Sequence, residues 1–376
     1  MGKIDYRKLK GSQNMRVRLV LATLTSTPIQ VEDIRLDETI PGLRPHEVSL
    51  LRLIERICDD CIVQINDTGT KFKYKPGIIV GGKCSHDCGT SRSIAYFLEP
   101  LILLGLFAKK PLSIRLTGIT NDSKDPSVDT FRSTTLPLLS RFGVPSEGLG
   151  LKIVSRGVPP LGGGVVQLSL PIVHSLKAVN LTDVGMIGKI RGVTFSTKVS
   201  VQFENTMVHA ARGIFNNLLP NVFIFTDHRS GDQAGESPGY GISLVAHTTT
   251  GCCISVDTAV SHERKEDVSE MEDEKPMLTP PDEVGENIAC ALLEEIEQGG
   301  VVDSTHQGLL FLLCALCPGD MSKVRVGKLS PHGIETLRVI RDFLRITFDI
   351  KPDPATGTVI VKGLGSGLTN LSRKVS

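Results

Sequence analysis

Apolar residues recur at helical spacing in two stretches that copy one another. Residues 45–57 read PHEVSLLRLIERI, and residues 331–343 read PHGIETLRVIRDF. Both open with Pro-His, and their apolar positions and one arginine stand in register. Proline suits the first turn of a helix, and the apolar spacing marks one buried stripe. A weaker third copy starts at Pro126 and keeps Arg132 in phase, so the sequence predicts a repeated structural unit.

Strands are predicted around each of the three copies. Each copy is followed by a predicted strand pair, at 61–65 and 70–74, at 151–154 and 165–170, and at 346–350 and 358–362. A strand precedes each copy, at 29–34, 112–116 and 323–326, and a helix precedes that strand, at about 13–25, 89–107 and 303–317. The unit is therefore helix–strand–helix–strand–strand. Three such units with packed helices predict an α+β fold with a pseudo-threefold core.

The pattern changes between the second and third units. The predicted elements there are a strand at 186–195, a helix at 203–218, strands at 222–226, 241–248 and 252–259, and a helix at 283–298. They do not continue the threefold plan, so we predict an inserted α/β domain after the second repeat. The core would comprise 1–183 and 300–376, and the inserted domain 184–299. Within it, 261–281 is rich in Glu, Asp, Lys and Pro, which predicts a disordered loop.

Composition limits the partners and the metal chemistry. The net charge of the 376 residues is +1, so contact with nucleic acid would have to come from local patches. No apolar run reaches the roughly 18 residues of a membrane span, and we expect no membrane partner. Nine cysteines is an odd number, typical of reduced thiols. Of the C-x-x-C pairs at 58/61 and 314/317, the second falls on an apolar helix and Cys58 ends another, so the pairs are interpreted as buried thiols rather than zinc ligands. The short motif 84–88 lacks a second half-site, and we expect no metal and no cofactor.

Candidate phosphate-binding residues precede two predicted helices. Gly89-Thr90-Ser91-Arg92 stands before one helix, and residues 10–16, ending in Arg16, stand before another. Backbone amides at a helix start favour phosphate, with arginine as the counter-charge. The glycine-rich turn 156–164, headed by Arg156, either cradles an anion or forms a tight hairpin that needs positive φ. His332 also opens a helix, although His46 holds the same repeat position and indicates a helix-start consensus as the alternative.

Taken together, these segments resemble the RNA 3′-terminal phosphate cyclase superfamily. The resemblance rests on 13–16, 41–43, 75–77, 81–82, 156–164, 190–192, Gln307 and the helix start at 331–332. That family has three such repeats with an inserted domain after the second, and its active members adenylate a histidine that corresponds to His332. A closer resemblance is to the cyclase-like branch, which lacks cyclase activity. It is carried by 122–125, 226–228, 235–241, 301–307 and 371–374.

Two acidic groups of the active cyclases are missing from this chain. Active cyclases carry a glutamate–glycine run before the first helix. Residues 8–12 of this chain read KLKGS there and contain no acidic residue. Where active cyclases carry an Asp-Gln pair, this chain has His306-Gln307. Nucleotidyl transfer develops charge on phosphate and favours a metal clamp, which these substitutions weaken. The cyclase-like branch usually lacks the catalytic histidine as well, but His332 is present here.

The resemblance implies a non-catalytic factor of the nucleus and nucleolus. Such a factor acts in precursor rRNA processing and small (40S) subunit assembly, within the small-subunit processome and docked to a large nucleolar GTPase. One alternative is an endonuclease that cleaves precursor rRNA, for which the clustered candidates are His332, His306, Asp303 and Arg92. Another is an active cyclase. The residues expected to bind the anion or RNA are Arg16, Gly89, Thr90, Ser91, Arg92, Arg156, Gln307 and His332.

Overall fold

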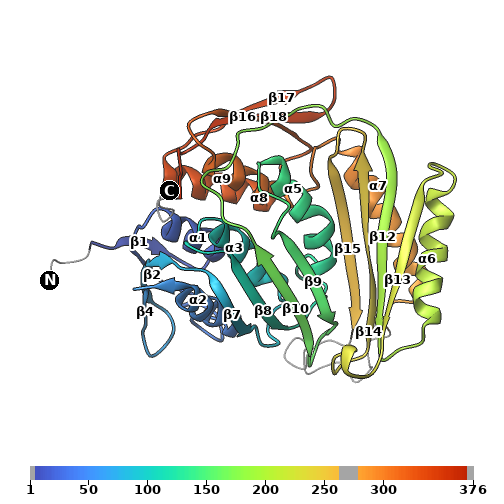
Figure 1. The fold of residues 1–376 in the computed structure, drawn as a ribbon, viewed down its shortest axis with the longest axis horizontal. Coiled ribbons are helices and arrows are strands. Elements are labelled where there is room, and N and C mark those ends of the chain that lie inside the picture. The colour runs from blue at the N-terminus through green and yellow to red at the C-terminus, as the bar shows by residue number, and fades with distance from the viewer. Residues whose placement is uncertain (1–4, 262–277, 371–376) are drawn as a thin grey trace.

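The computed structural model describes residues 5–261 and 278–370 (Figure 1). Helices and mixed sheets alternate along the chain, which confirms the expected α+β class. Of the loop predicted at 261–281, residues 262–277 lie outside the described residues. In the described part of the chain, no helix is long and apolar enough to cross a lipid bilayer.

Three four-stranded sheets share one pairing plan. In each, the first two strands are parallel and the remaining neighbours are antiparallel. The first sheet has the order β1 (Arg7–Lys10), β2 (Ile29–Glu32), β5 (Phe72–Lys75), β4 (Ile62–Ile65). The second has β7 (Gly82–Asp87), β8 (Leu112–Gly118), β10 (Gly164–Leu170), β9 (Gly150–Ser155). The third has β11 (Asn180–Leu181), β16 (Met321–Val326), β18 (Thr358–Leu364), β17 (Asp349–Asp353).

The helices of these units pack into one large hydrophobic core. They are α1 (Met15–Leu24), α2 (Pro45–Ile57), α3 (Ala95–Leu106), α8 (Gln307–Leu316) and α9 (Pro331–Leu344). The weak third copy forms α4 (Val128–Thr130), the π-helical turn η1 (Phe131–Thr135) and α5 (Leu136–Arg141). Helices α3 and α8 are buried almost all round because nearly every residue in them is apolar. A two-stranded ribbon, β3 (Cys58–Asp59) with β6 (Ile78–Ile79), follows α2.

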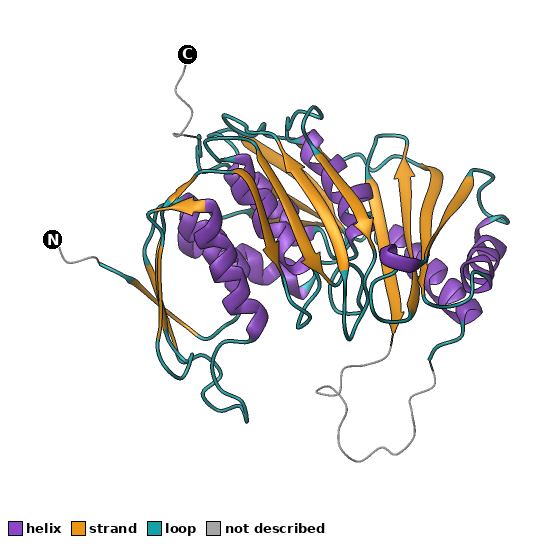
Figure 2. Ribbon diagram, turned by 60° about the horizontal axis from the view of Figure 1, so that its bottom comes forward, coloured by secondary structure: helices purple, strands orange, loops and turns teal. Residues whose placement is uncertain are grey.

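A segment between β11 and α8 builds a fourth sheet with its own hydrophobic core. The sheet has the order β13 (Val222–Arg229), β12 (Ile187–Thr197), β14 (Gly239–Thr248), β15 (Cys253–Ser261). The helices α6 (Gln202–Phe215) and α7 (Pro281–Glu297) pack against it, and a 3₁₀ turn η2 (Gly231–Gln233) follows β13. Figure 2 shows these two helices gathered on one side of the sheet.

Two details differ from the sequence-based expectation. Each of the three sheets begins with a strand that the pattern did not reveal, namely β1, β7 or β11. Since β11 pairs with β16, the long segment that follows it interrupts the elements of the third sheet. The helix predicted at 89–107 begins only at Ala95, because residues 88–94 form a loop that connects β7 to α3.

Candidate anion-binding site

A pocket of about 210 Å³ opens where α1, α2, α3 and α9 begin. The amides of a first helical turn lack partners within the helix, and the helix dipole adds positive potential there. Several helix starts around one cavity therefore favour an anion. The residues that line the pocket are Ser12, Asn14, Met15, Arg16, Val17, Arg35, His46, Glu47, Arg92, Tyr96 and His332. Three of the predicted residues, Arg16, Arg92 and His332, thus meet in one place.

The ring of Tyr96 lies between two arginines of this pocket. The Cζ atom of Arg16 is 4.8 Å from the ring centroid, and that of Arg92 is 5.2 Å from it. Arg92 is further fixed by two hydrogen bonds to Asp125, from Nε to Oδ2 at 2.7 Å and from Nη2 to Oδ1 at 2.6 Å. Cation–π contact and a two-pronged carboxylate bond limit how far these side chains move. The guanidinium groups are thus held in place before any ligand arrives.

Arg35 and Glu47 were missed by the sequence reasoning. Arg35 donates two hydrogen bonds of 2.7 Å to the carboxylate of Glu47. The same carboxylate accepts the backbone N–H of Arg44 at 2.7 Å, which caps the start of α2. The sequence offered a partial signal, because a glutamate on the third residue of a helix is typical of such capping. Nothing in the sequence pointed to Arg35 or to Tyr96.

The two helix-start histidines occupy different environments. His46 makes an edge contact with Tyr96, with ring centroids 4.9 Å apart, and its Nδ1 makes no hydrogen bond within the described residues. Burial lowers the pKa of His46 to about 4, so its imidazole is neutral at pH 7. His332 packs over Gly308 of α8, where a Cβ atom would lie 2.6 Å from its Nε2.

Gln307 lies behind the pocket and supports the start of α9. Its side-chain amide donates to the carbonyl of Lys328 at 2.8 Å, and its Oε1 accepts the N–H of Ser330 at 2.8 Å. The Ser330 hydroxyl in turn accepts the N–H of Gly333 and caps α9. Gln307 is buried and does not line the pocket, so its contacts position the turn that carries His332.

Arg156 does not belong to this pocket, which corrects the sequence-based expectation. Its guanidinium is fully buried and donates to both carboxylate oxygens of Asp129, at 2.7 and 3.0 Å, and to Asp227 at 2.8 Å. Burial alone would lower the pKa of Arg156, but the two aspartates outweigh it and raise the pKa. The arginine is a buried ion-pair centre between α4 and β13.

The loop 89–91 also falls outside the pocket lining. Gly89 and Thr90 are exposed, and the N–H of Gly89 donates to Asp87 at 3.0 Å. Because α3 begins at Ala95, the amides of Gly89, Thr90 and Ser91 are not those of its first turn. Of this predicted motif, only Arg92 reaches the site.

His306 and Asp303 form a buried pair that does not line the pocket containing His332 and Arg92. Nδ1 of His306 is 2.8 Å from Asp303, and its Nε2 is 2.9 Å from the hydroxyl of Thr135. Burial opposes charge on His306, but the Asp303 carboxylate outweighs it and raises the pKa of the imidazole. The other oxygen of Asp303 accepts the N–H and the hydroxyl of Ser255 at 2.9 Å. These contacts join the strand β15 to the turn before α8.

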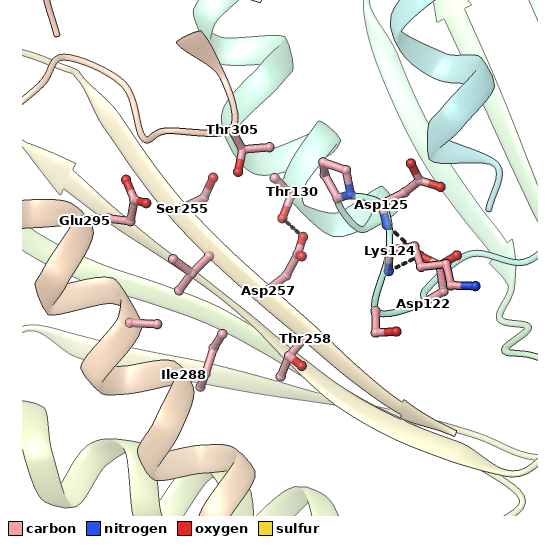
Figure 3. A pocket seen from close by; sticks show the side chains of 14 residues that line it. Asp122, Lys124, Asp125, Thr130, Ser255, Asp257, Thr258, Ile288, Glu295 and Thr305 are labelled. Carbon is pink, nitrogen blue, oxygen red and sulfur yellow. Dashed lines mark hydrogen bonds between the residues drawn. The ribbon is translucent and has the colours of Figure 1, made fainter. Parts of the chain in front are cut away.

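A second cavity, of about 320 Å³, separates the loop 122–126 from β15 and α7 (Figure 3). Asp122, Asp125, Asp257 and Glu295 line it together with Lys124, so acidic side chains outnumber basic ones there. Asp257 accepts hydrogen bonds from Ser127 and Thr130. Burial raises the pKa of Asp257. In the part of the chain that the structure describes, no three His, Cys, Asp or Glu side chains are grouped closely enough to hold a metal ion.

Comparison with known proteins defines the class to which this fold and pocket belong. Residues 7–350 match the RNA 3′-terminal phosphate cyclase family, and the chain belongs to that family. It is 65% identical over 374 residues to a probable RNA 3′-terminal phosphate cyclase-like protein of Arabidopsis thaliana, covering 99% of this chain and 100% of the relative.

Two further relatives specify the branch. The RNA 3′-terminal phosphate cyclase-like protein of Homo sapiens is 44% identical over 369 residues, which is 96% of each chain. The rRNA processing protein rcl1 of Schizosaccharomyces pombe is 40% identical over 375 residues, which is 99% of each chain. Within the family, the chain therefore belongs to the cyclase-like branch.

Proposed function

We propose that this protein acts in rRNA processing and in assembly of the small (40S) ribosomal subunit, without catalysing cyclisation. In this proposal the pocket at the helix starts binds a phosphate group of RNA. The observation that carries the proposal is the pairing of the acids near the pocket. Glu47 is bonded to Arg35, Asp125 to Arg92, and Glu99 lies 3.8 Å from Arg16. Carboxylates engaged in this way are not free to clamp a metal ion, and Arg16, whose distance to Glu99 is the longest of the three, keeps most of its charge for an anion.

The names of the relatives support the rRNA part of the proposal. One of them is described as an rRNA processing protein, and it matches this chain over nearly the full length of both. We further propose a nucleolar location, contact with precursor rRNA in the small-subunit processome, and a large nucleolar GTPase as partner. These follow from the resemblance to the cyclase-like branch.

The proposal includes the organisation of the chain. Residues 1–183 and 300–376 would form a pseudo-threefold core, and 184–299 an inserted domain. The shared strand order of three sheets and the separate hydrophobic core around α6 and α7 support this division.

Replacing His332 tests whether the pocket binds or catalyses. Cells depleted of the protein should accumulate unprocessed small-subunit rRNA, and His332→Ala should restore processing about as well as wild type. Losing one charge-assisted hydrogen bond costs about 1.5–3 kcal/mol, whereas an enzyme that loses its nucleophile falls by orders of magnitude. The exposed His174, replaced in the same way, is the matched control.

Two outcomes would overturn the non-catalytic proposal. One is a folded His332→Ala protein that leaves precursor rRNA uncut while His174→Ala restores processing. The other is a covalent adenylate, formed with radiolabelled ATP on the wild type and lost in His332→Ala. The first result would favour the endonuclease, and the second the active cyclase.

A further inference from the structure

The outer face of the fourth sheet carries two exposed phenylalanines. Along β13, Val222 and Ile224 are buried in the core formed with α6 and α7, and the alternate residues point to the other side. Phe223 and Phe225 are 53% and 54% exposed, with ring centroids 4.5 Å apart. Two large aromatic rings side by side in solvent mark a surface that contacts another molecule.

Strand β12 places a cation beside these rings. Arg191 is the cross-strand partner of Phe223, and Val193 is the partner of Phe225. The guanidinium of Arg191 donates to Asn221, to its carbonyl at 3.1 Å and its side-chain oxygen at 2.9 Å. These bonds hold the guanidinium at the start of β13, the strand that carries Phe223.

A second cation, Lys189, stands two residues before Arg191 on β12 and therefore on the same face of the sheet. Lys189 of β12 is exposed and is paired with His247 of β14. Burial lowers the pKa of His247. The charges of Lys189 and Arg191 lower it further, because both cations lie near the imidazole. The acidic residue next along β13, Asp227, is compensated by ion pairs with Arg156 and Arg229. Positive charge therefore predominates around the two rings.

The other half of this face is covered. The hydroxyl of Ser243 on β14 lies 3.2 Å from that of Thr130, and Asp257 on β15 accepts the N–H of Ser127. The main core thus packs on β14 and β15 and reaches Asp227, near the end of β13, through Arg156. Phe223 and Phe225 lie before that contact on β13, which is the edge strand on the far side (Figure 1). The open surface, formed by β12 and β13, has helices behind it and aromatic rings in front.

We propose that the β12–β13 face binds single-stranded RNA, with bases stacked on Phe223 and Phe225 and phosphates near Arg191 and Lys189. This rests on the proposed function in rRNA processing and gives the protein a second RNA contact besides the pocket. Sheets that carry exposed aromatic rings opposite their helices bind unpaired bases in this way, because every base has a π-face. The bases of a duplex are already stacked, so duplex RNA does not fit the same site.

Binding of a labelled single strand by the full-length protein tests the proposal. Fluorescence anisotropy with a 5′-fluorescein 12-nucleotide RNA compares wild type with F223L/F225L and F223Y/F225Y. Leucine keeps the apolar surface without the ring, and affinity should fall by about tenfold for each ring lost. Tyrosine keeps stacking and should bind within about twofold of wild type. The exposed Leu218 after α6, replaced by serine, is the control and should bind like wild type.

Crosslinking tests the same RNA-binding surface on the wild-type protein, without any variant. Ultraviolet irradiation of the wild-type complex should attach RNA to the peptide that contains Phe223 and Phe225. Equal affinity of the leucine pair and wild type, no single-strand binding by wild type, or crosslinks only elsewhere would overturn the proposal. So would a wild-type dimer that the leucine pair dissolves, because the face would then join two copies. A different result would contradict the proposed function itself, namely wild-type protein that does not restore rRNA processing in depleted cells.

Discussion

The imidazole of His332 occupies space that only a glycine at position 308 leaves open. A Cβ atom on Gly308 would lie 2.6 Å from Nε2 of His332 and 2.7 Å from its Cδ2. Non-bonded atoms normally stay about 3.5–4.0 Å apart. Gly308 stands at the start of α8, and His332 at the start of α9. The close approach of two helix starts therefore sets the position of the histidine.

Gly308→Ala should move His332 out of the pocket with little loss of stability. The clashing atoms are at the end of a side chain that can rotate, and alanine favours a helix by about 0.5–1 kcal/mol. The displaced imidazole loses its bond to the anion, so phosphate affinity should fall as far as in His332→Ala. The double variant should bind like either single variant, which a double-mutant cycle measured by calorimetry would reveal.

Gly213→Ala in α6 is the matched control for this substitution. No atom lies within 4 Å of the Cβ that it would add. It should raise the free energy of unfolding by about 0.5–1 kcal/mol and leave phosphate affinity unchanged. Wild-type affinity in Gly308→Ala would contradict the positioning role of the glycine.

Arg156→Met should strongly destabilise the protein. It removes the buried guanidinium that bonds both Asp129 and Asp227, and Asp129 is 2% exposed. Removing one member of a buried ion pair costs about 3–5 kcal/mol. Urea denaturation would measure the loss. Arg132 also contacts Asp129, at 3.1 Å, but its side chain is 45% exposed. Arg132→Ala should therefore lower the free energy of unfolding by no more than about 1 kcal/mol. Equal losses of stability in the two variants would contradict this prediction.

The sequence predicted best the elements that carry their own local signals. Helix α2 spans the predicted 45–57, and α9 begins at the predicted Pro331, because proline and an apolar stripe define both. The strands β7 and β11 escaped prediction. β7 is largely polar and is held by parallel pairing to β8, while β11 has only two residues. Their stability comes from neighbours distant in sequence.

The same distinction applies to the candidate site. Arg16 and His332 lie at or beside helix starts that the sequence marks, and they reach the pocket. Arg156 was misassigned because its partners, Asp129 and Asp227, are 27 and 71 residues away in the chain. A buried arginine and an anion-binding arginine look alike in a sequence. Only the fold separates them.

The stability of the protein should fall as pH drops from about 6.5 towards 4, through His46. Burial lowers the pKa of His46 to about 4 in the folded protein, whereas the unfolded chain titrates near 6.5. Between these values the unfolded state binds the proton, so acid favours unfolding. Urea unfolding at pH 7 and pH 5 should show a smaller pH effect in His46→Gln than in wild type. His174→Gln, at an exposed histidine, should keep the wild-type pH effect, and identical profiles for all three proteins would contradict the assignment.

Arg16→Gln should weaken binding of phosphate to the pocket. Among the described residues, the polar contacts of Arg16 are long, 3.5 Å to the carbonyl of Tyr96 and 3.8 Å to Glu99, and its other contact is with the Tyr96 ring, so its loss should leave the fold intact. One charge-assisted hydrogen bond is worth about 1.5–3 kcal/mol, which corresponds to roughly a ten- to hundredfold loss of affinity. Isothermal titration with inorganic phosphate measures this affinity with a ligand that has no base to stack on Phe223 or Phe225.

The matched control for Arg16→Gln is the same substitution at exposed Arg212 of α6, which should keep wild-type affinity. Crystals grown in sulfate provide the independent check, with a sulfate expected between Arg16, Arg92 and His332. Because Arg92 and Arg16 are already oriented around Tyr96, the ion should bind without moving either side chain. A pocket filled only with water in such crystals, or equal phosphate affinity in the two arginine variants, would show that these helix starts do not form an anion site.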